Sequence, residues 1–324
     1  MKYKAIIIIL LLASCTKVIE IDLPDPPDKL VVNCFFSTGN KFIVHLSHSQ
    51  NILAEDTTVI KNGDIRLYAN DIYQCSLNHI VDGFYSHDTM IVRAGVKYKI
   101  TAIASGYDQV EAEDSAPLVT LLDSVFYDPD LYTDSEGSYY YKMQLFFADN
   151  SSHRNFYEVN LLHFNDEDEF ELIRLNGDNE KVIINEGDEE YYSGLCIFSD
   201  ELINGNQCIL KLRTNSTLTG NRKEMRLLSV SETFYKYRKS WIKHSFAQFP
   251  DIANPMEPVS LFSNVKGGFG IFGRIFRQYR NNLLKMRLKN ICHLITTLFL
   301  FVETSVAQEV LISGFVKDSF QPNH

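Results

Sequence analysis

The chain has 324 residues, which is enough for one large or two small domains at about 150 residues per domain. Hydrophobic residues form 45% of it and charged residues 22%, a balance typical of folded proteins and not of intrinsically disordered ones. The formal net charge of -10 argues against a nucleic-acid-binding protein, because neutralising phosphates requires a basic face.

The first residues have the layout of an export signal. Lys2 and Lys4 precede an apolar run over residues 5–12, which is the charged-then-apolar order of a signal peptide. A transmembrane helix needs about 20 apolar residues, and the charged Lys17 follows too soon for one. We therefore predict a signal peptide over residues 1–14; the alternative is an ordinary buried N-terminal segment.

This signal ends in Leu12-Ala13-Ser14-Cys15, which resembles the bacterial lipobox. In that motif small residues let the signal peptidase approach, and the cysteine thiol receives diacylglycerol before cleavage. Cys15 is therefore the predicted lipid-attachment residue and the first residue of the mature chain. Acyl chains contribute about 0.8 kcal/mol per buried CH₂ group, so a multiply acylated terminus would hold the protein on a bilayer without a membrane span.

Residues 15–28 read as a tether. They contain Pro24, Pro26 and Pro27, and proline's fixed φ and missing N–H favour an extended chain. We expect the folded body to begin near Lys29.

Residues 29–115 have the pattern of an Ig-like or related β-sandwich domain. Short apolar or alternating runs predict strands over residues 30–32, 42–44, 65–68 and 98–103. Glycine tolerates positive φ, so the pairs between these runs predict tight turns. Those pairs are Asn62-Gly63, Asp82-Gly83, Ala94-Gly95 and Ser105-Gly106.

Residues 116–273 predict a second β-rich domain with one packed helix, so the fold class is mainly β. The expected strands are residues 119–127, 139–148, 156–164, 171–175, 181–184, 207–213 and 225–230.

The predicted helix follows the last of these strands. Ser229 and Glu232 have capping-box spacing, and Phe234, Tyr237 and Trp241 follow at i, i+3 and i+7. Such a stripe favours packing onto a sheet over a ligand platform.

No catalytic signature is present in the sequence: it lacks GxSxG, HExxH, a P-loop and a GxGxxG after a strand. We therefore expect no enzyme activity, no cofactor and no catalytic residue. His45 and His48 lie three residues apart along a predicted strand, which places them on opposite faces and disfavours a shared metal. We therefore expect no bound metal ion.

Acidic residues gather in three places. Asp128, Asp130, Asp134 and Glu136 precede Gly137, but the glycine and terminal glutamate positions differ from those of a calcium loop. A solvated turn is the favoured interpretation. Two further acidic runs, residues 166–169 and 187–190, read as exposed hairpin ends.

Six cysteines are present, of which lipidation would use Cys15 and Cys292 lies in an unusual tail. Export permits disulfides among the other four. The candidate pairs are Cys196 with Cys208, closing a hairpin, and Cys34 with Cys75, linking strands. Four cysteines allow three pairings, and buried free thiols are the equal alternative.

Residues 15–273 together resemble a family of Bacteroidota outer-membrane lipoproteins, domain of unknown function 4249. The closing string of residues 262–273, FSNVKGGFGIFG, is the most specific element. The weaker elements are residues 18–23, Gly83-Phe84-Tyr85, Gly95 with Tyr98 and Ile100, Gly106-Tyr107, and the helix of residues 231–237. The resemblance implies an outer-membrane lipoprotein with β domains, usually encoded beside a TonB-dependent receptor, and supplies no catalytic residues.

Residues 274–324 depart from that family. A basic stretch leads into a second signal-like segment over residues 286–307, with an apolar core at 291–302 and the cleavage-like Ser305-Val306-Ala307. Residues 310–318 then resemble the first strand of the carboxypeptidase-regulatory-like domain that opens many TonB-dependent receptors. Our hypothesis is that a frameshift, deletion or gene-model error joins the start of a neighbouring receptor gene; the alternative is a genuine membrane-associated helix.

The leading functional expectation is a binding or accessory lipoprotein that works with a TonB-dependent receptor in nutrient uptake. It would be lipid-anchored in the outer membrane, on the periplasmic or the cell-surface side. A structural or adhesive surface protein that binds protein or glycan is the alternative. A hydrolase that uses carboxylates such as Asp128 or Asp134 is the third.

Overall fold

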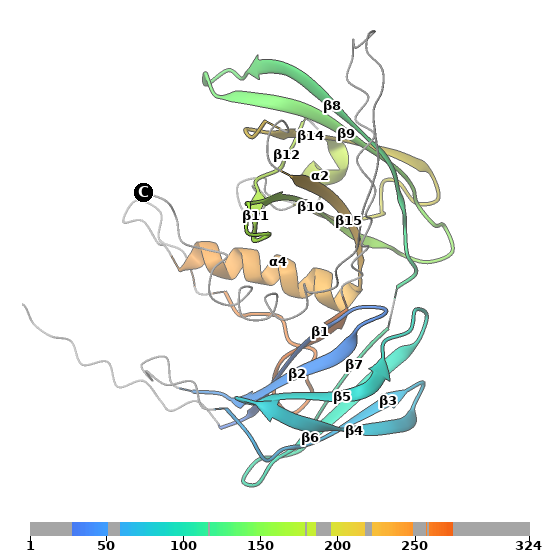
Figure 1. The fold of residues 1–324 in the computed structure, drawn as a ribbon, viewed down its shortest axis with the longest axis vertical. Coiled ribbons are helices and arrows are strands. Elements are labelled where there is room, and N and C mark those ends of the chain that lie inside the picture. The colour runs from blue at the N-terminus through green and yellow to red at the C-terminus, as the bar shows by residue number, and fades with distance from the viewer. Residues whose placement is uncertain are drawn as a thin grey trace, which may run out of the picture.

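The computed structural model describes residues 28–50, 59–115, 117–178, 180–185, 196–217, 222–248, 257 and 259–274. The predicted signal peptide, Cys15 and the tail from residue 275 lie outside the described residues. The described chain is mainly β, which confirms the predicted fold class, and forms two β lobes with a long helix between them (Figure 1). Within the described ranges, no helix is long and apolar enough to cross a membrane.

The first lobe is one eight-stranded sheet that curls until its two edge strands approach each other. Neighbouring strands are antiparallel except β1 and β16, which are parallel. Alternate residues of β1 and β2 are buried, as expected for a sheet with one solvated face. In spatial order the strands are β16 (Phe269–Arg274), β1 (Leu30–Phe36), β2 (Lys41–His48), β5 (Phe84–Ile91), β4 (Ile72–Val81), β3 (Asp64–Ala69), β6 (Lys97–Ile103) and β7 (Val110–Ser115).

A two-residue turn joins β4 to β5, as the sequence predicts. Val81 pairs with Phe84 across it, and Asp82 and Gly83 both have positive φ, 44° and 76°. Positive φ at both central residues matches the right-handed twist of the flanking strands. A Cβ atom at Gly83 would lie 2.8 Å from the carbonyl oxygen of Leu46, so a larger residue would also collide with β2.

The last strand of the family-like region completes the first lobe. The sequence groups residues 116–273 into the second domain, but β16 pairs with β1 in parallel register, with Val31 opposite Phe269. Gly270 permits this close approach, because it has φ of 108° and an added Cβ would lie 2.1 Å from the carbonyl oxygen of Val32. The second lobe is therefore inserted between β7 and β16 of the first.

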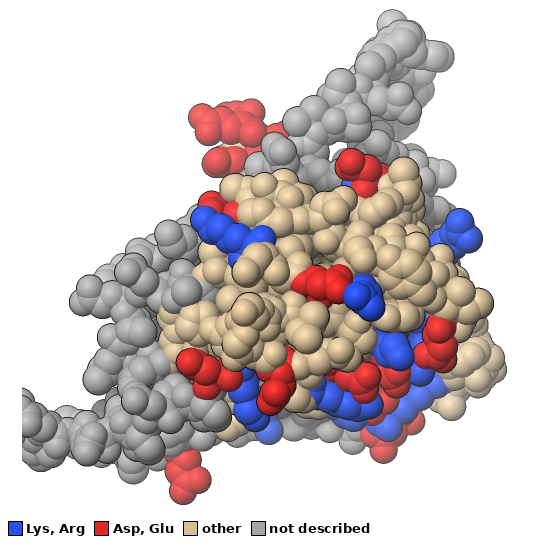
Figure 2. Space-filling model, turned by 90° about the horizontal axis from the view of Figure 1, so that it is seen from below, with Lys and Arg blue, Asp and Glu red and all other residues tan. Residues whose placement is uncertain are grey.

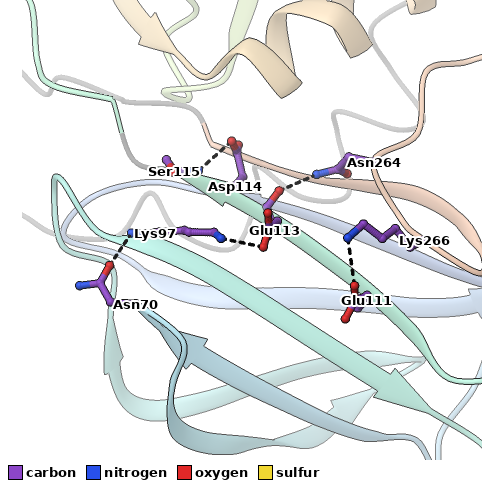
Figure 3. A network of polar contacts seen from close by, with 8 residues as sticks. All are labelled: Asn70, Lys97, Glu111, Glu113, Asp114, Ser115, Asn264 and Lys266. Atoms are coloured by element: carbon purple, nitrogen blue, oxygen red, sulfur yellow. Dashed lines mark hydrogen bonds and ion pairs between the residues drawn. The ribbon is translucent and has the colours of Figure 1, made fainter. Parts of the chain in front are cut away.

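An isolated bridge and side chains join β7 to the segment that leads into β16. The backbones of Glu111 and Lys266 exchange hydrogen bonds, and their side chains form an ion pair of 3.1 Å. Asn264 donates from Nδ2 to the carbonyl oxygens of Glu113 (3.1 Å) and Phe272 (2.8 Å), and its Oδ1 accepts from the N–H of Phe272 (2.9 Å). Figure 3 shows the contacts of Glu111 with Lys266 and of Glu113 with Asn264 along β7.

The outward face of the first lobe carries charges of both signs. Seen from that side, basic and acidic side chains lie next to one another and not in separate patches (Figure 2). Lys97 pairs with Glu113 at 2.9 Å and Arg66 with Asp64 at 2.7 Å. Exposed pairs of this kind contribute little to stability, but charges on a sheet discourage pairing with other chains.

The second lobe is a pair of four-stranded sheets packed face to face. Its central strands, β9 (Tyr139–Ala148) and β10 (Phe156–Phe164), have the predicted bounds. Between the sheets the rings of Phe147, Tyr157 and Phe198 pack with centroids 5.3 to 6.4 Å apart. One sheet has the order β12 (Asn176–Gly177), β14 (Gln207–Thr214), β9, β8 (Leu122–Thr133); in the other, β10 pairs with β15 (Lys223–Val230), β13 (Cys196–Ser199) and β11 (Phe170–Ile173).

Two sequence-based expectations for this lobe are wrong. Residues 181–184 form a short helix, α2 (Lys181–Asn185), and not a strand. Short apolar runs do not distinguish the two structures, and the carboxylate of Glu180 accepts a hydrogen bond from the N–H of Val182 at the helix start. In addition, β8 continues through the expected acidic loop to Thr133, because Pro129 is accommodated where the register of this edge strand shifts.

The long helix α4 (Glu232–Ala247) lies between the lobes (Figure 1). Its N-cap is Ser231, whose hydroxyl accepts from the N–H of Phe234; the predicted cap, Ser229, lies in β15 and accepts from the N–H of Thr120. The ring of Phe234 packs edge-on against Phe35 of β1, with centroids 5.6 Å apart. The helix therefore packs against β strands, as the sequence predicts.

Candidate functional site

An open pocket of about 410 Å³ lies at one end of the second lobe, where β9 begins and β14 ends. Its volume falls within the range of small-molecule sites, about 300–1,000 Å³. The floor consists of four buried side chains and the rim of polar and aromatic ones. The floor residues are Leu175, Ile183, Cys196 and Thr214. The rim residues that matter below are Asp134, Glu136, Tyr139, Tyr140, Arg174 and Arg213.

The tip of the β8–β9 hairpin forms the acidic part of this rim. The carboxylate of Asp134 accepts hydrogen bonds from the backbone N–H groups of Glu136 (3.0 Å) and Ser138 (2.8 Å). Asp134 therefore shapes the turn, and the side chain of Glu136 is left exposed to solvent. The turn expected at this acidic segment is present, although it is shorter than the sequence indicates.

Two arginines form the basic part of the rim. Arg213 lies on β14 opposite Asn176 of β12, and Arg174 precedes Asn176 by two residues, which brings both guanidinium groups to the same pocket. In the described part of the chain neither arginine forms an ion pair. The guanidinium carbon of Arg213 lies 5.7 Å from the centre of the Tyr140 ring, a cation–π contact that orients it.

Beside the pocket, aromatic and basic side chains alternate on the solvent face of the sheet. Tyr132 of β8 stacks on Tyr140 of β9 with ring centroids 5.8 Å apart, and the ammonium of Lys142 lies 4.3 Å from the Tyr132 ring centre. The Tyr132 hydroxyl donates to Asp128 at 2.8 Å, and this hydrogen bond raises the pKa of Tyr132. Lys142 adds a third cation near the pocket to Arg174 and Arg213, in a protein whose net charge is negative.

A second polar cluster joins the lobes. Asp114, near the end of β7, accepts from the N–H groups of Arg274 (2.9 Å) and Ser115 (2.8 Å), and it hydrogen-bonds the side chain of Ser231 at the start of α4. Burial raises the pKa of Asp114 to about 6. The buried guanidinium of Arg274 donates to the carbonyl of Pro117 and the hydroxyl of Thr38. These contacts hold strands and helix together and do not form a cavity.

Farther along α4, a buried ion pair attaches the helix to the second lobe. Arg238 of α4 contacts Glu158 of β10 at 3.2 Å, and their side chains are only 6% and 3% exposed. The guanidinium also lies 5.0 Å from the ring centre of Trp241. The N-terminal half of α4 contacts both lobes, since Phe234 packs on Phe35 and Tyr235 packs on Phe156 with ring centroids 4.7 Å apart, and Arg238 adds a buried contact to the second lobe.

The anticipated disulfides are not formed. Cys34, Cys75, Cys196 and Cys208 are all free thiols in the structure. Cys34 lies on β1 and Cys75 on β4, with β2 and β5 between them, whereas a disulfide joins Cα atoms within about 7 Å. The thiol of Cys196 points to the carbonyl oxygen of Leu175 at 3.9 Å. The four cysteines are therefore packing residues in this structure, and Cys15 lies outside the described residues.

The other chemistry-bearing residues of the sequence are dispersed. His45 and His48 sit on β2 with different neighbours, Phe84 and Tyr107. Asp128 is engaged by Tyr132, and Asp134 by its own turn. Among the described residues no group of three or more His, Cys, Asp or Glu side chains could hold a metal ion. The expected absence of catalysis and of a metal stays a prediction.

The pocket arginines were not anticipated from the sequence. Arg174 and Arg213 are 39 positions apart, and nothing near either one marks it as a ligand-binding residue. The only local signal is the run Tyr139-Tyr140-Tyr141 at the start of β9, where three aromatic rings alternate between the two faces of a sheet.

The fold and the pocket together define a two-lobed β protein with an open pocket of small-molecule size at one end of its second lobe. The model of a family described as "Domain of unknown function (DUF4249)" matches residues 16–275, and the chain belongs to that family. The match ends before the signal-like segment of the tail.

Comparison with curated proteins gives no match. A solved structure, "The structure of a beta-glucuronidase from glycoside hydrolase family 2", is similar at 9% sequence identity and a TM-score of 0.21. The similarity covers 84% of this chain and 24% of that one, so the chain spans about a quarter of that enzyme. At this TM-score the likeness says nothing about activity.

Proposed function

We propose that this protein is a lipid-anchored binding protein of the outer membrane that serves as the accessory partner of a TonB-dependent receptor in nutrient uptake. The observation that supports it best is the pairing of a lipobox-like signal ending at Cys15 with a preformed pocket in the second lobe. Concave pockets with an apolar floor and a few convergent polar groups are the usual form of ligand sites.

The arrangement of the lobes suits this role. The body begins at Lys29 beside β1 in the first lobe, whereas the pocket lies in the second lobe, beyond α4 (Figure 1). A chain anchored through Cys15 and residues 16–28 is therefore attached through the first lobe. The second lobe is left to meet ligand or receptor.

Two measurements test the proposal. Metabolic labelling with palmitate should label the wild-type protein and not Cys15→Ser, and only the wild type should fractionate with membranes. Cys75→Ser is the matched control, because it removes another thiol without touching the signal. Affinity purification of the tagged protein from cross-linked native membranes should then recover a TonB-dependent receptor. Absence of label, or a labelled protein recovered without a receptor, would overturn the proposal.

A structural or adhesive role is the second candidate, and exposed apolar residues of β4 favour it. Ile72, Tyr73, Ile80 and Val81 are 53% to 67% exposed although they lie within a strand. Each end of β4 thus carries two neighbouring exposed apolar side chains, and exposed apolar groups that occur together mark protein-contact surfaces. Recovery of a surface protein other than a receptor in the same purification, lost on Ile72→Ser with Ile80→Ser, would favour this role.

A further inference from the structure

The rim of the pocket has the composition of a site for a singly charged organic anion. Arg174 and Arg213 supply guanidinium groups, each with several N–H donors in a planar fork that matches a carboxylate. The carboxylates of Asp134 and Glu136 balance their charge. A multiply charged phosphate would meet two acidic groups at this rim, whereas a monocarboxylate adds one negative charge.

The aromatic residues of the rim indicate a ring-shaped body for that anion. Tyr139 is 64% exposed at the mouth and offers a ring face, whereas the Tyr140 ring already contacts Tyr132 and the Arg213 guanidinium. Aromatic rings present flat apolar faces of large contact area. Such faces fit the C–H face of a pyranose ring or another six-membered ring.

The remaining polar groups favour a ligand that carries hydroxyls. The side chain of Glu136 accepts hydrogen bonds only, and Asn176 and Asn215 offer both donors and acceptors at the same rim. A simple aromatic acid would leave these groups without a partner from the ligand. A sugar acid supplies a carboxylate for the arginines, a ring face for Tyr139 and hydroxyls for the carboxylate and amides.

We infer that the pocket at the end of the second lobe binds a sugar acid of monosaccharide size, with its carboxylate between Arg174 and Arg213 and its ring on Tyr139. The floor residues Leu175 and Ile183 exclude water beneath the ring. This inference rests on the proposed binding function and names its ligand class. It does not require the lipid anchor or the receptor.

The test is a titration of the purified full-length protein in detergent, followed by ligand-observed NMR. D-galacturonate is the probe, D-galactose the neutral control, and inorganic phosphate the competing anion. We expect saturable binding of galacturonate, no binding of galactose at the same concentration, and no displacement by equimolar phosphate. Arg174→Gln and Arg213→Gln should each weaken binding about 10- to 100-fold, since each removes charge-assisted hydrogen bonds.

Arg93→Gln is the matched control, because Arg93 is an exposed arginine of the first lobe. Equal thermal unfolding midpoints for the three variants would show that the pocket substitutions leave the fold intact. No binding of galacturonate, equal binding of galactose, displacement by phosphate, or unchanged affinity in both pocket variants would overturn the inference. These results leave palmitate labelling and receptor recovery untouched, so failure of the ligand assignment is distinguishable from failure of the proposed function.

Discussion

The side-chain amide of Asn264 forms with Phe272 both hydrogen bonds that a neighbouring β-strand would provide: it donates to the carbonyl oxygen and accepts from the N–H. The same amide also donates to the carbonyl of Glu113 on β7. The Asn264 side chain therefore provides hydrogen bonds that a further strand between β7 and β16 would provide. β16 pairs with β1 on one side and is hydrogen-bonded to Asn264 on the other.

Asn264→Ala should destabilise the protein by about 1–3 kcal/mol, because it leaves backbone groups of Phe272 and Glu113 without their partner. Equilibrium unfolding in urea measures the change. Asn204→Ala, at an exposed loop position, should change the free energy of unfolding by less than about 0.5 kcal/mol. Equal losses in the two variants would contradict the closing role of Asn264.

Gly270→Ala should be more damaging than Gly137→Ala. Both glycines have positive φ, so both substitutions carry a backbone penalty of about 1–2 kcal/mol. Only at Gly270 would the new Cβ collide with the backbone of Val32; at Gly137 nothing lies within 4 Å. We expect a further loss of about 1–3 kcal/mol for Gly270→Ala, or no soluble protein. Thermal unfolding of the pair measures this, and matching midpoints would rule out the tight β1–β16 contact.

The stability of the lobe junction should fall as the pH rises from about 4 to about 6. Burial raises the pKa of Asp114 to about 6 from an ordinary 3.8, so the folded protein binds a proton more tightly than the unfolded chain. Above pH 6 both states are ionised and the cost of burying the charge is fully present, up to about 3 kcal/mol. The groups that face this carboxylate are Ser231 and Thr233 of α4, Ser115, and Arg274 of β16.

Urea unfolding between pH 4 and pH 7 measures this dependence against that of Asp114→Asn. The variant cannot ionise, so its free energy of unfolding should lack the decrease between pH 4 and 6 that Asp114 causes. Parallel pH profiles for the two proteins would show that Asp114 has an ordinary pKa in the fold.

The buried thiols should resist alkylation in the folded protein. Burial raises the pKa of Cys196 and Cys208 to about 12, and that of Cys34 further, so little thiolate exists at pH 8. Cys75 is only partly buried and should react first with iodoacetamide. After unfolding without reductant all four should be labelled, as peptide mass spectrometry would show. Two thiols that stay unlabelled in denaturant would instead indicate a disulfide.

Removing one partner of the Glu158–Arg238 pair should cost more than removing both. Arg238→Met removes the guanidinium that contacts a carboxylate only 3% exposed, a loss of about 3–5 kcal/mol. The double variant Glu158→Leu with Arg238→Met should recover most of that loss, because two charges no longer have to be desolvated. A double-mutant cycle by urea unfolding measures the coupling, and additive losses would contradict it.

Local patterns predicted much of this fold. The strands β9 and β10 have the expected bounds because their apolar residues are dense and clear turn signals flank them. Patterns failed where neighbours far along the chain decide the outcome. The run at residues 181–184 could form a strand or a helix, and its packing against β13 made it α2. The parallel partner of β1 is 238 positions away, at Phe269, and no periodicity within residues 262–273 indicates it.

The candidate site was harder to foresee than the fold. Its arginines come from β14 and from the segment before β12, and only the pairing of Arg213 with Asn176 brings them to one rim. Conversely, Asp128 and Asp134 stand out in the sequence because they crowd a short segment, but both serve local hydrogen bonds. Residues that lie close together in the sequence were therefore a poor guide to which residues line the pocket.

The pairing of β1 with β16 bears on how this chain can fold as it is synthesised from its N-terminus. Seven of the eight strands of the first lobe, β1 to β7, precede the inserted lobe in the chain. The eighth, β16 (Phe269–Arg274), follows it, so the edge of β1 stays unpaired until β16 has been synthesised. The inserted lobe holds its own core, including Tyr157 and Phe198, and so can consolidate while the first waits. The order in which the lobes are completed is thus opposite to the order of synthesis: the sheet of the lobe nearest the N-terminus gains its last strand only at the end.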